Sequence, residues 1–302
     1  MSSINIGIII ARYDFHLYLI EPYSMKSNNK FKSTLFSLFV GLTLAMSPSS
    51  QASNTDFSTN DSLLSDGSAI NKAGRQRMLS ERIVKAYIQL SIEVDVLKAE
   101  KQLTSAHELF EQQLQELITY APTNNITHNL DAVNTQWLKL TAIVKEKPDI
   151  KKIPELIIIG EQLVTRCHQV VLDIQRFSNT SSAALVNTSG RQRMLSQRMA
   201  KYYFAHLAGQ RQNTTVASFK TSLAEFEKGL ESLKSSPENT PAILAALKRV
   251  NAQLKFSKSG FERLGQGDYI PHVISRTTES MLKRMESITK QYEELHNKLQ
   301  TS

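Results

Sequence analysis

The heptapeptide GRQRMLS occurs twice in this 302-residue chain, at residues 74–80 and again at 190–196. Other segments repeat in the same order and at nearly the same spacing. They are FEQQLQEL at 110–117 with FEKGLESL at 226–233, VNTQWLKL at 133–140 with VNAQLKFS at 250–257, and Ile-Pro at 153–154 and 270–271. Several landmarks in one constant order indicate a tandem duplication. We therefore predict two units with the same fold.

The composition favours helix in both units, because Leu, Ala, Lys, Glu, Gln and Ser dominate while glycine and proline number only 11 and 8. The predicted helices span about 67–94, 99–119, 127–146 and 154–177, then 183–208, 215–234, 240–264 and 271–300. The polar stretch NTSS at 179–182 separates the units and supplies good N-cap residues. We predict an all-α fold of two tandem up-down four-helix bundles behind a signal peptide.

The N-terminal region carries the three parts of a secretory signal peptide. Lys26, Lys30 and Lys32 precede the apolar run STLFSLFVGLTLAM at 33–46, and small residues follow up to Ala52. The run is shorter than the roughly 20 residues that a membrane helix needs. We expect cleavage near Ala52, export to the periplasm, and three segments: 1–52, 53–180 and 181–302. Residues 1–24 are interpreted as a wrongly chosen start before Met25, or alternatively as a retained anchor.

The formal net charge of +8 points to anionic partners. An exported chain would not meet nucleic acid, which leaves small anions or acidic protein surfaces. Cys167 is the single cysteine, so no internal disulfide is possible, and its helical surroundings predict a buried thiol. The histidines lack metal-ligand spacing. The chain also shows no Ser-His-Asp order, paired carboxylates or glycine-rich phosphate loop, so we expect neither an enzyme nor a metal or cofactor site.

The heptapeptide helix has two apolar faces. At about 100° per residue, Leu79 and Ile83 share the face toward the bundle core, and Arg77 falls on the opposite face with Val84 and Ile88. The second copy repeats this pattern around Arg193. A second apolar face predicts a partner helix, and an arginine within it needs an acceptor.

The first acceptor to consider for Arg77 is Glu81 at i+4, but the equivalent position in the second copy is Gln197, which cannot neutralise Arg193. A four-helix up-down bundle starts and ends on the same side, so a short break returns the second bundle parallel to the first. Arg77 and Arg193 then face each other across a pseudo-twofold axis. Two such groups repel unless an anion lies between them, and guanidinium groups suit that role.

The segments NKAGRQRMLSERIVKAY at 71–87 and NTSGRQRMLSQRMAKYY at 187–203 resemble the signature of the PilJ/NarX-type sensory domain. That family comprises periplasmic four-helix modules of nitrate/nitrite sensor kinases and of type IV pilus chemoreceptors. The resemblance implies that the arginine before the methionine binds the anion, one from each of two facing copies. Those residues are Arg77 and Arg193 here. The chain departs from the sensor kinases in having no kinase motif.

The remaining candidates surround these two arginines. Ser80 and Ser196 are predicted to add hydroxyl donors. Gly74 and Gly190 either form part of the site or ease the crossing of the helices. Arg75, Arg82, Arg191 and Arg198 are secondary ligand candidates, with flank-bridging or solvated positions as the alternative.

Two classes of function follow. The first is a binding or sensing module for a small oxyanion such as nitrate or nitrite, which signals through a separate membrane-bound sensor, chemoreceptor or pilus component. The second is a structural adaptor of a type IV pilus or chemoreceptor system without a small ligand, in which the arginines pair with acidic partner residues.

Overall fold

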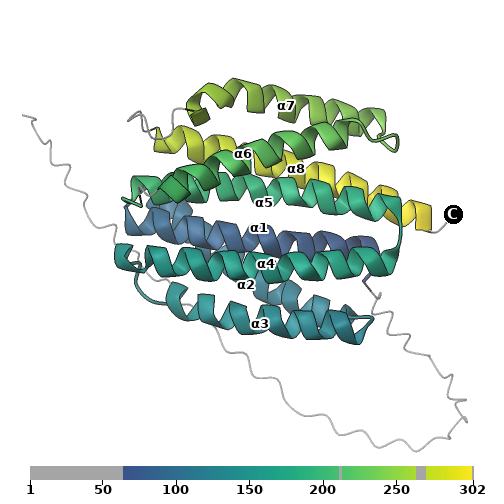
Figure 1. The fold of residues 1–302 in the computed structure, drawn as a ribbon, viewed down its shortest axis with the longest axis horizontal. Coiled ribbons are helices and arrows are strands. Elements are labelled where there is room, and N and C mark those ends of the chain that lie inside the picture. Colours follow the sequence, from purple (N-terminus) through teal and green to yellow (C-terminus); the bar gives the residue numbers. More distant parts are fainter. Residues whose placement is uncertain (1–63, 211–212, 263–269, 301–302) are drawn as a thin grey trace, which may run out of the picture. The chain divides into compact units, whose positions relative to one another are not determined.

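The computed structural model describes residues 64–210, 213–262 and 270–300, and that part of the chain is built from helices (Figure 1). Their bounds are α1 Asp66–Ser91, α2 Val96–Tyr120, α3 Asn124–Val144, α4 Ile153–Ser178, α5 Ser181–Leu207, α6 Asn213–Lys234, α7 Pro241–Glu262 and α8 Pro271–Gln300, with the short 3-10 helix η1 at Ile150–Lys152 before α4. The predicted all-α fold is confirmed. The predicted signal peptide and the alternative start at Met25 lie outside the described residues.

Local capping explains where the two heptapeptide helices begin. The Ser65 side chain accepts a hydrogen bond from the backbone N–H of Ser68 at the start of α1, and Thr180 accepts one from Ala183 at the start of α5. Between α4 and α5, Asn179 adopts a left-handed conformation with φ of 48°. The polar NTSS segment therefore interrupts the helix, and α4 and α5 do not form one continuous rod.

Each half of the described chain closes on itself as four helices. In the first half, α1 packs against α2 and α4, and α3 packs against the same two helices. The second half repeats this arrangement with α5 in the place of α1. Phe110 and Trp137 stack in the first core at 4.0 Å between ring centroids. Cys167 is buried and free there, as predicted.

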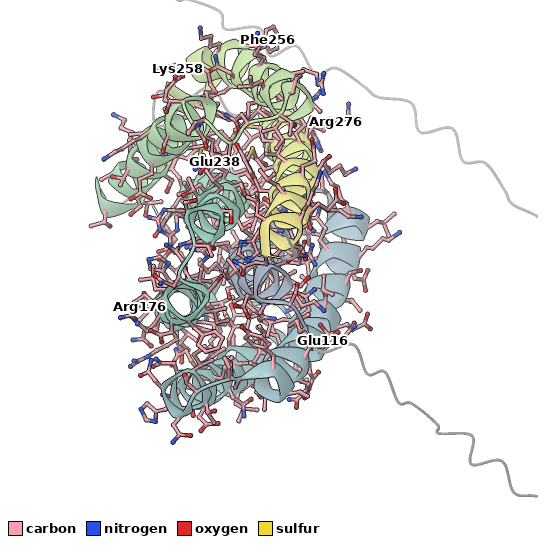
Figure 2. The ribbon with its side chains drawn as sticks, turned by 90° about the vertical axis from the view of Figure 1, so that its right-hand side faces the viewer. Glu116, Arg176, Glu238, Phe256, Lys258 and Arg276 are labelled. Carbon is pink, nitrogen blue, oxygen red and sulfur yellow. The ribbon has the colours of Figure 1, made fainter. Side chains whose placement is uncertain are left out.

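The two halves meet through α1, α4, α5 and α8, and the most extensive contact is between α1 and α5. Figure 2 looks along the helices and shows α2 and α3 on one side of these inner helices, with α6 and α7 on the other. Val84 and Ile88, on the second apolar face of α1, are both buried, and Val84 lies against Gly160 of α4. The predicted partner helix is therefore present, and it is the second heptapeptide helix.

None of the described helices combines the length and the apolar character that a membrane crossing requires.

Candidate functional site

Arg77 and Arg193 lie at the centre of the contact between α1 and α5. Both side chains are 0% exposed. A methyl group built on Gly74 would lie 3.2 Å from Nη2 of Arg77 and 3.5 Å from Nη2 of Arg193. The same construction on Gly190 gives 3.1 Å to Nη2 of Arg193 and 3.6 Å to Nη2 of Arg77. The two guanidinium groups thus converge beside the two glycines.

The glycines make room for this convergence. Each stands three residues before its arginine, on the same helix face. A β-carbon at either position would be tighter against a guanidinium than ordinary van der Waals contact permits. Glycine in a helix interior costs about 0.5–1 kcal/mol relative to alanine. Both helices nevertheless carry glycine at the equivalent position, where the missing side chain leaves space for the two guanidinium groups.

The two arginines share one kind of contact and differ in another. Nη2 of Arg77 donates to the carbonyl oxygen of Asn187 at 3.3 Å, and Nη2 of Arg193 donates to that of Asn71 at 3.1 Å. These are equivalent bonds across the pseudo-twofold axis. The Nη1 atoms differ in their partners, because Arg193 donates to the Glu286 carboxylate at 2.8 Å.

Nη1 of Arg77 lies 3.0 Å from Nδ1 of His168 instead. A guanidinium group only donates, so this ring nitrogen must be the acceptor. In the described part of the chain, Arg77 has no carboxylate in ion-pair contact, and Nε of both arginines has no hydrogen-bond partner. The site therefore holds two buried cations, of which only one is directly neutralised.

The electrostatics follow from this geometry. Burial, followed by the charges of Arg191 and Arg193, lowers the pKa of Arg77 to about 9. Burial also lowers the pKa of Arg193, but Glu286 opposes that shift. Burial together with the charge of Arg77 lowers the pKa of His168 to about 4. At neutral pH the guanidinium groups are charged and the imidazole is neutral, so additional negative charge would be favourable here.

The serine hydroxyls lie within the same two helices. Ser80 donates to the carbonyl oxygen of Gln76 at 2.8 Å, and Ser196 donates to that of Arg193 at 2.7 Å. Each hydroxyl proton is therefore engaged by its own helix. Their predicted role as ligand donors stays a prediction.

The comparison with known families decides what kind of module this is. The family described as type IV pili methyl-accepting chemotaxis transducer N-term, PilJ, matches residues 58–151 and 175–300. The chain belongs to the PilJ family. The two matched segments each contain one copy of the heptapeptide and so agree with a tandem pair of PilJ-type domains. No curated protein and no solved structure shows significant similarity to the chain.

Domains of the PilJ family are non-catalytic periplasmic sensory modules of chemotaxis transducers. This agrees with the predicted class of function at the level of sensing. The position of the boundary between the two units at 180/181 stays a proposal.

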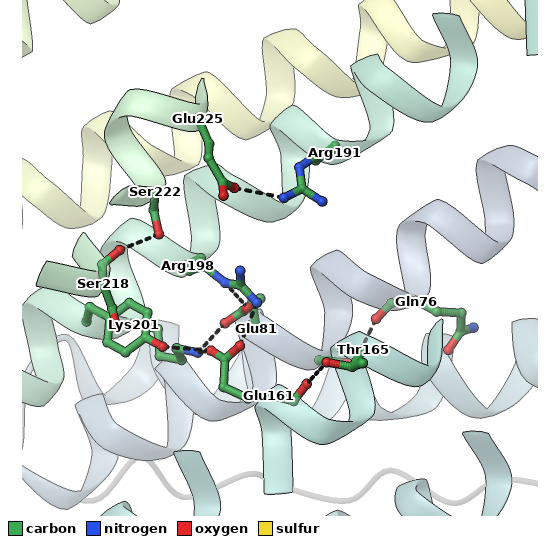
Figure 3. A network of polar contacts seen from close by, with 12 residues as sticks. Gln76, Glu81, Glu161, Thr165, Arg191, Arg198, Lys201, Ser218, Ser222 and Glu225 are labelled. Carbon is green, nitrogen blue, oxygen red and sulfur yellow. Dashed lines mark hydrogen bonds and ion pairs between the residues drawn. The ribbon is translucent and has the colours of Figure 1, made fainter. Parts of the chain in front are cut away.

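The secondary arginine candidates of this PilJ-family chain all have carboxylate partners. Arg75 pairs with Glu286, Arg82 with Glu279, Arg191 with Glu225, and Arg198 with both Glu81 and Glu161. Figure 3 shows the last two arginines with their partners. These contacts are of the bridging kind, in which an arginine ties one helix to the next.

Glu81, the candidate acceptor for Arg77 at i+4, pairs with other cations in the structure. The Glu81 carboxylate lies 2.6 Å from Nε of Arg198 and 2.7 Å from Nζ of Lys201 (Figure 3). Both cations belong to α5, so the carboxylate turns across the interface rather than along its own helix. An i+4 spacing places two side chains near each other, but Arg198 and Lys201 supply two cations where Arg77 would supply one.

Sequence reasoning missed a pair of buried lysines. Lys85 contacts Glu279 and Gln197 at 2.8 Å each, and Lys201 contacts Glu81 and Glu161. Both lysines are 0% exposed. The signal was present, because a lysine follows each heptapeptide at the same interval, in SERIVK and SQRMAK. A cation repeated within a helix that is apolar on two faces indicates a buried ionic role.

Proposed function

We propose that the chain is an exported sensory module that binds a small oxyanion between Arg77 and Arg193 and passes the signal to a separate membrane partner. The observation that carries the proposal is the convergence of two fully buried guanidinium groups, with no carboxylate in contact with Arg77 among the described residues. A buried cation without a counter-charge, as Arg77 is here, is costly, and a bound anion removes that cost.

The chemistry of the ligand follows from the donors. Each guanidinium group presents a planar fork that matches oxygen pairs on one anion. Nitrate and nitrite are small, carry one negative charge and offer several oxygens, so they are the first probes. Among the described residues, the ion-pair contacts of Arg75, Arg77 and Arg193 involve a single carboxylate, that of Glu286, so this group of three cations could accept more than one further negative charge. Sulfate and phosphate therefore belong in the same test.

The site also suits a sensor because of where it lies. Arg77 belongs to α1 and Arg193 to α5, the first helices of the two proposed domains, 53–180 and 181–302. An anion held by both would pull on the two helices together, so its binding changes the packing between the halves. A membrane chemoreceptor or pilus component that contacts both halves would read that change. The export signal near Ala52 is proposed from the sequence alone.

A structural adaptor is the second candidate, in which acidic residues of a partner pair with the arginines. Burial speaks against it at this site, because Arg77 and Arg193 are both 0% exposed and a partner side chain would need to enter the α1–α5 interface. The exposed cations on the outer helices could still pair with acidic residues of a partner protein.

Calorimetric titration of the purified protein with nitrate, nitrite, sulfate and phosphate tests the proposal. One charge-assisted contact contributes about 1.5–3 kcal/mol. Arg77→Ala and Arg193→Ala should therefore each weaken binding by about tenfold or more, and the double variant should abolish it. Arg→Lys should restore little, because lysine lacks the planar fork. Binding that survives in the double variant would refute the arginine site and favour the structural-adaptor function.

A further inference from the structure

Glu286 occupies a position between the buried arginine pair and solvent. Its carboxylate accepts from Nη1 of Arg193 at 2.8 Å and also pairs with Arg75. The Arg193 side chain is 0% exposed, while that of Glu286 is 36% exposed. The carboxylate therefore connects a fully buried donor to the surface of α8.

The surface beside Glu286 is a basic pocket. An open pocket of about 510 Å³ between α1 and α8 is lined by Glu286. Its other charged lining residues are Lys72, Arg75, Lys283, Lys290 and Glu293. Four cations against two carboxylates give this pocket an excess of positive charge. Such a field raises the local concentration of anions next to Glu286.

In the described part of the first half, the equivalent position carries a histidine and not a carboxylate. Glu161 on α4 pairs with Arg198 and Lys201, and Glu279 on α8 pairs in the same way with Arg82 and Lys85. Seven residues after these two glutamates stand His168 and Glu286. A neutral imidazole thus contacts Arg77 where a carboxylate contacts Arg193. The pair is charged asymmetrically although its scaffold is nearly symmetric.

We propose that Glu286 is a built-in competitor for the oxyanion, so that a ligand entering from the basic pocket replaces its carboxylate on Nη1 of Arg193. This inference rests on the proposed function of the arginine pair. The displaced carboxylate keeps its ion pair with Arg75 at the mouth of the pocket. Glu286 therefore sets the affinity of the site and its preference among anions.

The physical reason is that one donor cannot serve two anions at full strength. The Glu286 carboxylate satisfies Nη1 of Arg193 and also repels a second negative charge nearby. The repulsion is greater for a doubly charged anion than for a singly charged one. Glu286 thus weakens the binding of sulfate more than that of nitrate. It does not compete for Arg77, because its carboxylate contacts Arg193 and not Arg77.

The test compares Glu286→Gln with the unaltered protein by titration with nitrate and with sulfate. The amide keeps the size of the side chain and removes its charge. We expect nitrate to bind at least about tenfold more tightly, because one charge-assisted contact no longer has to be exchanged. The gain for sulfate should exceed the gain for nitrate.

Glu293→Gln is the matched control. Glu293 lines the same pocket and accepts from Asn71 at 2.6 Å, but it makes no hydrogen bond to Arg193. Its substitution removes the same charge from the pocket without freeing Nη1. We expect a gain of less than about threefold, because the Glu293 charge is partly exposed to solvent and does not contact Arg193.

The outcomes separate this inference from the proposed function. If nitrate binding depends on Arg77 and Arg193 but is unchanged or weaker in Glu286→Gln, the competitor role is overturned and the oxyanion site stands. If neither protein binds any of the anions, both the proposed function and the competitor role are refuted. Binding by Glu286→Gln alone supports strong competition.

If far-ultraviolet circular dichroism shows that Glu286→Gln is unfolded, Glu286→Asp replaces it, and its shorter carboxylate should give an intermediate gain. Affinity in Glu286→Asp equal to or below that of the unaltered protein overturns the inference.

Discussion

His168 on α4 and Glu286 on α8 occupy equivalent positions in the two halves, and each contacts Nη1 of the arginine that its own half presents to the interface. The carboxylate neutralises Arg193, whereas the imidazole only accepts a hydrogen bond from Arg77. One substitution between the repeats therefore makes the two halves of the site electrostatically different.

Protonation of His168 should produce a measurable pH dependence of folding. Burial and the charge of Arg77 lower the pKa of His168 to about 4 in the folded protein, against about 6.5 in an unfolded chain. Between these values the unfolded state binds more protons, so the His168 contribution is complete above about pH 6.5 and is lost as the pH falls toward 4. In His168→Gln, the urea midpoint should fall less steeply over this window. Parallel curves for the two proteins would contradict the assignment.

Removal of the two arginine charges should change the free energy of unfolding differently. Arg77→Met removes a buried cation without a carboxylate partner, so the free energy of unfolding should stay equal or rise by about 1 kcal/mol. Arg193→Met removes a partner of Glu286, which is partly exposed and keeps Arg75, so it should cost about 1 kcal/mol. Urea unfolding in chloride buffer without oxyanions measures both. Equal losses in the two variants would show that the asymmetry has no energetic effect.

The buried carboxylate of Glu81 should be among the most sensitive positions. Its side chain is 0% exposed and contacts Arg198 and Lys201, so Glu81→Gln leaves two cations with Glu161 as their shared partner. We expect a loss of about 3 kcal/mol in the free energy of unfolding. Glu231→Gln is the control, because Glu231 forms an exposed pair with Lys234 that should contribute less than about 0.5 kcal/mol. A similar, small loss in both variants would refute the role of Glu81.

The space beside the glycines can be tested with a double-mutant cycle. Gly190→Ala adds a methyl group 3.1 Å from Nη2 of Arg193, and we expect it to cost about 1–3 kcal/mol, as overpacking does. In an Arg193→Ala background the same change should cost much less, because the crowded group is gone. Additive losses, measured by thermal and urea unfolding, would mean that the glycine serves the helix crossing instead.

Local sequence patterns predicted much of the architecture. The tandem heptapeptide predicted two equivalent helices, and the structure places them as α1 and α5 in extensive contact. Thr180 caps α5 within the predicted polar break. The placement of Arg77 on a second apolar face correctly indicated a buried interface. Periodicity and capping depend on residues a few positions apart, so the order of residues is sufficient to predict them.

Only the tertiary structure decided which residues complete the arginine pair. His168 is 91 residues from Arg77, and Glu286 is 93 residues from Arg193. The heptapeptides repeat with an offset of 116, whereas His168 and Glu286 are 118 residues apart, so simple repetition does not align them. Glu81, which the i+4 spacing offered as a candidate acceptor for Arg77, likewise pairs with two cations on α5. The physical reason is that a buried charge takes the counter-charge that packing brings closest, and packing between helices is set by the whole fold.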